Sequence, residues 1–283
     1  MTLIIKANGE KTEFDANKLR GTLERAGARP ETVEKVLSNV EKQVRENMTT
    51  KQIFKLIKKE LRHLERYTAQ RYNLRKGLLR LGPAGFRFEQ YVAAVLTAYQ
   101  YKTTIPEHDL SGLCVDHEID VMATRGEKSV MIEAKFRNRF GDTVTLKDTM
   151  ATWARYRDLV HGAKAGKCPT FNEVWVTTNG RFSDRALQFG VCKGIHMIGW
   201  GPEEHSFARM VDHAYLYPVT VLDYLRKREI EHFSRSGLML CSEVARQDPV
   251  KLAKRLGLEP GRMKKVVSDC RNVITGKHSQ EDK

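Results

Sequence analysis

The stretch that decides the fold of the central part of this chain is His117-Glu118-Ile119-Asp120-Val121, followed by Val130-Met131-Ile132-Glu133-Ala134-Lys135. Their apolar residues predict strands at 118–123 and 129–134. Because side chains alternate along a strand, Glu133 and Lys135 lie on the same face of the second strand. If the first strand is antiparallel and ends near Asp120, it brings the carboxylate of Asp120 beside that of Glu133.

This pair of carboxylates indicates a metal site. Two carboxylates a few ångströms apart repel each other unless a cation lies between them, and oxygen ligands favour Mg²⁺ or Mn²⁺. Lys135 could then orient an attacking water, lower the pKa of that water or neutralise charge on a phosphate. A D-x(n)-E-x-K pattern often occurs by chance, so the three residues could also be ordinary charges at strand ends.

Strands and helices alternate through the centre of the chain, which implies an α/β core with a mixed sheet. Beyond the two strands above, further strands are predicted at 173–178 and 195–199, and helices at 88–98, 148–159 and 184–189. The sequence Leu81-Gly82-Pro83-Ala84-Gly85 marks a break before this core, and a softer boundary follows near residue 232. The predicted domains are therefore residues 1–82, 83–232 and 233–283.

The order of a helix with Glu89, a strand with Asp120 and a strand with Glu133 and Lys135 resembles the PD-(D/E)xK nuclease superfamily, especially Mrr-like restriction endonucleases and Holliday-junction-resolvase relatives. The resemblance covers roughly residues 83–200. It implies a restriction-endonuclease-like core, in which a mixed central sheet is flanked by helices. It also implies that Asp120, Glu133 and the Ala134 backbone carbonyl bind the metal. Lys135 would be the catalytic lysine, and Glu89 would act through a water.

A later segment extends this resemblance. Trp175-Val176-Thr177-Thr178-Asn179-Gly180, followed by Phe182-Ser183 and Ala186, is similar to the strand, loop and helix that follow the catalytic strands in Mrr-like proteins. The proline common before the first aspartate is absent, because Ile119 occupies that position.

The N-terminal 80 residues predict a hairpin with a turn at Asn8-Gly9, followed by several helices, the first capped by Asp15 and the third by Thr49 or Thr50. The segments 5–9, 14–19 and 48–53 resemble the ATP-cone, a mainly helical nucleotide-binding domain. The resemblance implies ATP or dATP as a regulator, held by Lys6, Asp15, Lys18 and Thr50. Ala7 replaces an arginine that cones usually carry, so the domain could also keep the cone shape and bind only partners or DNA.

Positive charge is concentrated in the two flanks of the chain. The 283 residues include 49 Lys+Arg and 35 Asp+Glu, a formal charge of +14; residues 1–90 carry +9, residues 91–245 carry zero and residues 246–283 carry +5. This distribution favours a polyanionic partner. The densest basic stretch is Lys51–Arg80, and the segment 252–267 is similar to a helix-hairpin-helix element. We expect DNA contacts from Lys51, Lys55, Lys58, Lys59, Lys264 and Lys265. The alternative is that both are solvated helix faces.

Composition limits the remaining function classes. There is no apolar run of the roughly 18 residues that a membrane span needs, and the five scattered cysteines favour a reducing cytoplasm over a disulfide framework. The sequence therefore predicts a Mg²⁺-dependent endonuclease acting on duplex or branched DNA, with a nucleotide that changes its homo-oligomeric state. Two alternatives stay open: a non-catalytic, nucleotide-responsive DNA-binding protein on a degenerate nuclease fold, and a nuclease that processes RNA.

Overall fold

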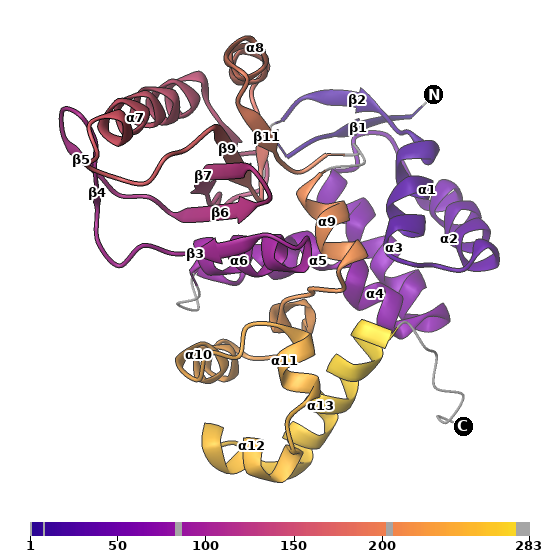
Figure 1. Cartoon of the computed structure of the whole chain (residues 1–283). Coiled ribbons are helices and arrows are strands. Elements are labelled where there is room, and N and C mark those ends of the chain that lie inside the picture. The colour runs from indigo at the N-terminus through magenta and orange to yellow at the C-terminus, as the bar shows by residue number, and fades with distance from the viewer. Residues whose placement is uncertain (1, 8, 83–86, 202–205, 276–283) are drawn as a thin grey trace. The chain divides into compact units, whose positions relative to one another are not determined.

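The computed structural model describes residues 2–7, 9–82, 87–201 and 206–275, in two compact units. The first unit combines residues 1–85 with residues 215–283, and the second contains residues 86–214 (Figure 1). The sequence had placed the two ends of the chain in separate domains. Asn8 of the expected turn, most of the expected break at 81–85 and the end of the chain from residue 276 lie outside the described residues.

The second unit contains a mixed sheet, as the sequence predicted, with five strands where four had been predicted. The strand order is β11-β9-β7-β6-β3. Neighbouring strands are antiparallel from β3 through β6 to β7 and parallel from β7 through β9 to β11. The strands are β3 (Lys102–Thr104), β6 (Val121–Arg125), β7 (Lys128–Lys135), β9 (Glu173–Thr178) and β11 (His196–Ile198).

Helices and shorter strands complete this unit. The two-residue strands are β4 (Leu110–Ser111), β5 (Asp116–His117), β8 (Thr143–Val144) and β10 (Arg181–Phe182). The helices are α6 (Phe88–Ala98), α7 (Leu146–Lys164), α8 (Asp184–Lys193) and α9 (Phe207–His213). Tyr156 and Leu159 of α7 pack in one core cluster with Met131 of β7. The face of β7 that carries Met131 therefore looks toward α7, and the alternation of side chains places Glu133 and Lys135 on that same face.

One strand begins later than expected. The sequence predicted a strand at 118–123, but β6 begins at Val121, and Asp116–His117 pairs instead with Leu110–Ser111. Asp120 therefore lies just before β6 and not inside it. The Asp120 side chain, and not its backbone, bonds to β7 here: its Oδ2 accepts a hydrogen bond of 2.6 Å from the backbone N–H of Ala134.

The first unit is mainly helical. A hairpin of β1 (Leu3–Ile5) and β2 (Lys11–Glu13) precedes five helices: α1 (Ala16–Arg25), α2 (Pro30–Gln43), α3 (Thr50–Leu64), α4 (Arg66–Tyr72) and α5 (Leu74–Leu79). As predicted, Asp15 caps α1, and Thr49 caps α3 in a reciprocal box with Gln52. Leu23, Val36 and Leu61 are fully buried in the core that these helices share.

The C-terminal elements pack on α4 and α5 in the same unit. They are η2 (Val219–Val221), α10 (Lys227–Arg235), α11 (Cys241–Ala245), α12 (Pro249–Leu256) and α13 (Pro260–Thr275). Thr220 Oγ1 donates to the Gly77 carbonyl at 2.7 Å, and Arg71 Nε donates to the Val273 carbonyl at 2.8 Å. No described helix is long and apolar enough to span a bilayer.

Candidate active site

Asp120 and Glu133 lie next to each other at one end of the β6 and β7 pair. Val121 pairs with Ile132 in the antiparallel ladder, so Asp120 and Glu133 occupy the next position along the two chains. The hydrogen bond from the Ala134 N–H fixes the carboxylate of Asp120 over β7. The structure therefore brings the two carboxylates together.

Asp120 is half-buried and lies beside the buried carboxylate of Glu133, and this environment alters its pKa. Burial, followed by the negative charges of Glu133 and Glu89, raises the pKa of Asp120 to about 6, against the opposing effects of the Ala134 N–H and Lys135. Holding both carboxylates ionised at this position requires a neighbouring positive charge.

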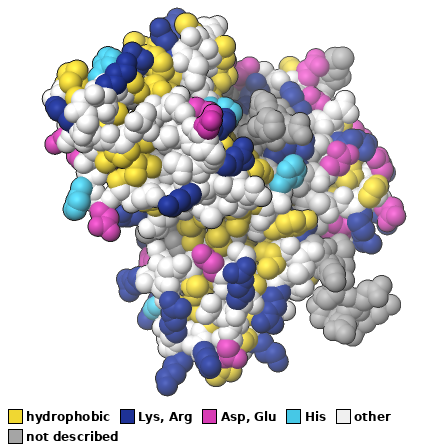
Figure 2. All heavy atoms as spheres, viewed as in Figure 1, with side chains coloured by type: hydrophobic (Ala, Val, Ile, Leu, Met, Phe, Trp, Pro, Cys, Tyr) yellow, Lys and Arg dark blue, Asp and Glu magenta, His cyan; other side chains and the backbone are white. Residues whose placement is uncertain are grey.

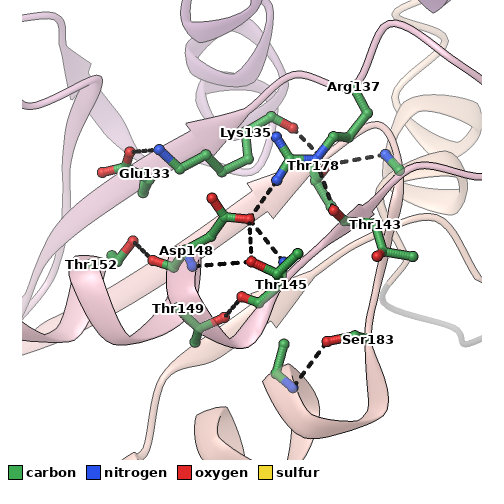
Figure 3. A network of polar contacts seen from close by, with 12 residues as sticks. Glu133, Lys135, Arg137, Thr143, Thr145, Asp148, Thr149, Thr152, Thr178 and Ser183 are labelled. Carbon is green, nitrogen blue, oxygen red and sulfur yellow. Dashed lines mark hydrogen bonds and ion pairs between the residues drawn. The ribbon is translucent and has the colours of Figure 1, made fainter.

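Two cations already contact Glu133. Its side chain is buried, with 4% of the residue exposed, and it forms ion pairs with Lys135 on its own strand and with Arg155 on α7. Figure 3 shows the Lys135 side chain reaching back toward Glu133. Arg155 was not among the predicted site residues. Its signal in the sequence is weak: an arginine beside Tyr156, in a helix with a buried face.

The donor set for a metal ion is small. Glu89 lies in the first turn of α6 and is close enough to Asp120 to influence the pKa of that residue. Within the described ranges, no group of three or more His, Cys, Asp or Glu side chains is arranged to hold a metal ion. The expected ligand oxygens are those of Asp120, Glu133 and the Ala134 carbonyl, and both oxygens of Glu133 also form ion pairs with Lys135 and Arg155. This set suits Mg²⁺, which is commonly bound by one or two carboxylates and keeps several waters.

A polar network holds the end of β7 next to this site (Figure 3). The Lys135 carbonyl accepts a hydrogen bond of 2.6 Å from Thr178 Oγ1. The backbone N–H of Arg137 donates to Asn179 Oδ1 at 2.7 Å, and its guanidinium donates to Asp148 in the first turn of α7, also at 2.7 Å. The strand that carries Glu133 and Lys135 is thus tied both to β9 and to α7.

The four residues expected to bind nucleotide lie around the hairpin and the starts of α1 and α3. The Ile5 N–H donates to the Met48 carbonyl at 2.9 Å, so β1 runs beside the residues that lead into α3, where Thr50 is the first residue. Lys6, which follows β1, forms an exposed ion pair of 3.0 Å with Glu10.

Asp15 and Lys18 lie together at the start of α1. The Asp15 carboxylate accepts hydrogen bonds from the N–H groups of Asn17 and Lys18, at 2.9 and 3.1 Å, and these bonds, that of Lys18 first, lower the pKa of Asp15. The ammonium of Lys18 lies 3.5 Å from Asp15 Oδ2, and its side chain is 84% exposed. Lys18 is therefore available to a ligand, whereas Asp15 already serves as a helix cap.

The predicted DNA-binding lysines differ in exposure. Lys51, Lys55, Lys59 and Lys264 are exposed, and Lys265 is exposed but lies 3.4 Å from Asp269. Lys58 departs from the prediction, because it is buried and forms a 2.9 Å ion pair with Asp223. Burial lowers the pKa of Lys58, and Asp223 opposes that effect. The helical pattern alone did not reveal this partner, which is far away in the sequence.

Comparisons with known proteins identify both ends of the chain. Residues 2–76 match the family model of the ATP cone domain, which confirms the predicted N-terminal ATP-cone and indicates nucleotide binding. Residues 217–274 match the model named "AF1548-like, C-terminal".

The matched relatives cover more of the chain. An uncharacterized protein of Archaeoglobus fulgidus is 34% identical over 167 residues, which span 58% of this chain and 90% of that protein. A crystal structure described as a protein of unknown function, AF1548, aligns with a TM-score of 0.54 at 31% identity, over 70% of this chain and 100% of that one.

Proposed function

The chain belongs to the AF1548-like family, and we propose that it is a metal-dependent DNA endonuclease that hydrolyses phosphodiester bonds and is regulated by nucleotide at its ATP-cone domain. The observation that carries this proposal is the constellation of Asp120, Glu133 and Lys135 at one end of the paired inner strands β6 and β7. The succession of α6, β3, β6, β7, α7 and β9 supports a restriction-endonuclease-like core around it.

Each residue has a distinct role in the proposed reaction. Mg²⁺ or Mn²⁺ held by Asp120, Glu133 and the Ala134 carbonyl would supply positive charge for the phosphate in the transition state. Lys135 can donate a hydrogen bond to the attacking water or to a phosphate oxygen. Arg155 contacts Glu133 and holds its carboxylate in place. Glu89, whose charge contributes to the raised pKa of Asp120, would act through a water molecule.

The proposal predicts that Asp120→Asn abolishes cleavage. The variant keeps the shape of the side chain and an oxygen for the Ala134 N–H but loses the charge, so we expect a rate at least about 100-fold lower with Mg²⁺. Plasmid, linear and branched DNA are incubated with each protein, and nicked and linear products are quantified on gels. Glu118→Gln is the matched control, because Glu118 is exposed two residues away, and it should cleave like the wild type.

Equal cleavage by Asp120→Asn and the wild type would show that the site is assigned wrongly.

A second function is favoured by a specific observation: Lys135 and Arg155 already neutralise the charge of Glu133, so the site can be electrostatically satisfied without a metal. The chain would then be a non-catalytic, nucleotide-responsive DNA-binding protein. Wild-type protein that binds these DNAs but cleaves none of them, with Mg²⁺ or with Mn²⁺, would establish that alternative.

A further inference from the structure

Helix α10 presents an exposed basic face outside the two basic stretches that the sequence analysis singled out. Lys227, Arg228 and Arg235 are exposed on it, and together with Glu231 and His232 they line a shallow hollow of about 440 Å³. Lys227, Glu231 and Arg235 recur every fourth residue, so they form one row along the helix. The Lys227 ammonium is 3.9 Å from the carboxylate of Glu231, which is the acidic group of this face.

The other side of α10 anchors the helix in its unit. Ile230 and Phe233 are buried, and Glu229, also buried, accepts a hydrogen bond of 2.8 Å from Arg262 Nε and one of 2.6 Å from the Arg226 N–H. The orientation of the helix is therefore fixed by apolar packing and by a buried ion pair, and the basic face is held outward.

The acidic residues around α10 are engaged within the fold. Residues 215–275 contain 12 Lys and Arg and 7 Asp and Glu. Glu243, Asp248 and Glu259 accept backbone N–H bonds at helix starts. Asp223 and Asp269 form ion pairs with basic residues of α3 and α4. Figure 2 shows Lys and Arg side chains gathered in the lower part of the view, where Figure 1 places α10 and α12, with few acidic ones between them.

We propose that the exposed face of α10 binds the phosphate backbone of duplex DNA. This inference rests on the proposed function and identifies a surface by which the endonuclease holds its substrate. The exposed side chains of this face are charged, and its large apolar residues point inward. The face is therefore suited to a polyanion and not to insertion into a lipid surface, which requires exposed apolar side chains.

The length of α10 fits a duplex. At a rise of about 1.5 Å per residue, Lys227 and Arg235 are about 12 Å apart along the helix axis. The major groove of B-DNA is about 12 Å wide. A helix lying across the groove can therefore place one cation against each of the two phosphate strands, with Arg228 beside the first.

The test is DNA binding by the full-length chain without cleavage. A labelled duplex of about 25 base pairs is titrated in EDTA at several KCl concentrations, and binding is followed by fluorescence anisotropy. The variant Lys227→Gln/Arg228→Gln/Arg235→Gln removes three charges from the face. We expect its affinity to fall at least about 10-fold at 100 mM KCl, and the slope of log K against log[salt] to decrease by about 2 to 3.

The matched control removes the same number of charges elsewhere. Lys35, Lys42 and Lys193 are exposed, and their triple exchange to Gln should leave the salt slope near the wild-type value. Equal weakening in both triple variants would overturn the inference, because net charge alone would then explain the loss. If the wild type bound a duplex RNA of the same length more tightly than the duplex DNA, the inference would also be overturned. If the α10 variant binds normally while Asp120→Asn abolishes cleavage, the α10 surface is wrong and the proposed endonuclease activity stands.

Discussion

Glu65 is the most completely buried carboxylate among the described residues of the first unit, and its surroundings hold it in the ionised form. Its Oε1 accepts hydrogen bonds from Thr32 Oγ1 at 2.6 Å and from Arg29 Nε at 3.0 Å, and its Oε2 accepts one from Thr68 Oγ1 at 2.7 Å. Burial acts to raise the pKa of Glu65, but these hydrogen bonds outweigh it and hold the pKa below its usual value. Glu65 lies between α3 and α4, and its carboxylate accepts hydrogen bonds from Thr32 of α2 and Thr68 of α4. One charged side chain therefore links the three helices.

We expect Glu65→Gln to lower the free energy of unfolding by about 2 to 3 kcal/mol at pH 7, because it removes a charged acceptor of several hydrogen bonds. Since the folded pKa is depressed, the stabilisation is present above the unfolded pKa of about 4.3 and is lost as the pH falls toward the folded pKa. Urea unfolding followed by circular dichroism at pH 7 and pH 3 measures both effects.

The control for this exchange is Glu34→Gln, at an exposed ion pair with Arg20, which should change the free energy of unfolding far less, because solvent screens an exposed pair. A Glu65→Gln variant that loses as much stability at pH 3 as at pH 7 would show that the charge is not the origin of the effect.

At the candidate site, the alternation and pairing of strands predict where some side chains lie, but the positions of others depend on how distant elements pack. The period of two along a strand places Lys135 on the same face as Glu133, and an antiparallel pairing places Asp120 opposite. Arg155 is different, because its contact with Glu133 depends on how α7 is rotated about its axis when it packs on the sheet. Lys58 shows the same limit, since its partner Asp223 is supplied by a distant part of the chain.

At the scale of elements, the contact between α5 and η2 joins the two ends of the chain. A Cβ added to Gly77 would lie 2.8 Å from Val221 Cγ1 and 3.1 Å from the Val221 backbone nitrogen. We therefore expect Gly77→Ala to lower the free energy of unfolding by about 1 to 3 kcal/mol through overpacking, although alanine favours a helix. Differential scanning calorimetry would record a lower melting temperature for the transition of this unit.

Gly21 provides the matched control in α1. A Cβ at Gly21 meets no atom within 4 Å, so Gly21→Ala should stabilise the same unit by about 0.5 to 1 kcal/mol. If both exchanges shifted the melting temperature in the same direction, the close approach of α5 and η2 would not be the cause.

The boundaries of the elements show where patterns of sequence are informative. The predicted strand at 173–178 and helix at 88–98 have the bounds of β9 and α6. The β-branched and aromatic residues at 174–178 define β9, and a clear periodicity defines α6. The helix expected at 148–159 extends over Leu146–Lys164, and the strand expected from 118 begins at Val121. The earlier start of α7 follows from the cap that Thr145 Oγ1 makes with the Asp148 N–H, and the later start of β6 follows from the bond of the Asp120 carboxylate to the Ala134 N–H. Periodicity records neither bond.

For the whole molecule, the number of units could not be read from the sequence. A break near 82 and a softer one near 232 suggested three domains, yet the residues on either side of the central unit pack together. The hydrogen bond from Thr220 to Gly77 spans 143 positions of sequence. The ATP-cone match and the AF1548-like C-terminal match therefore belong to one compact unit, which contains both the candidate nucleotide residues and the basic face of α10.

We expect nucleotide to change the oligomeric state of the chain, since a ligand that binds one association state more tightly shifts the equilibrium toward it. Sedimentation velocity without nucleotide, with ATP and with dATP should give different sedimentation profiles for the wild type. Lys6→Gln/Lys18→Gln should remove the difference, and Lys35→Gln/Lys42→Gln, on exposed positions of α2, should retain it. Thermal stabilisation of the wild type by the same nucleotides shows independently that they bind. Stabilisation together with an unchanged sedimentation profile would mean that the ATP-cone binds its ligand without controlling assembly.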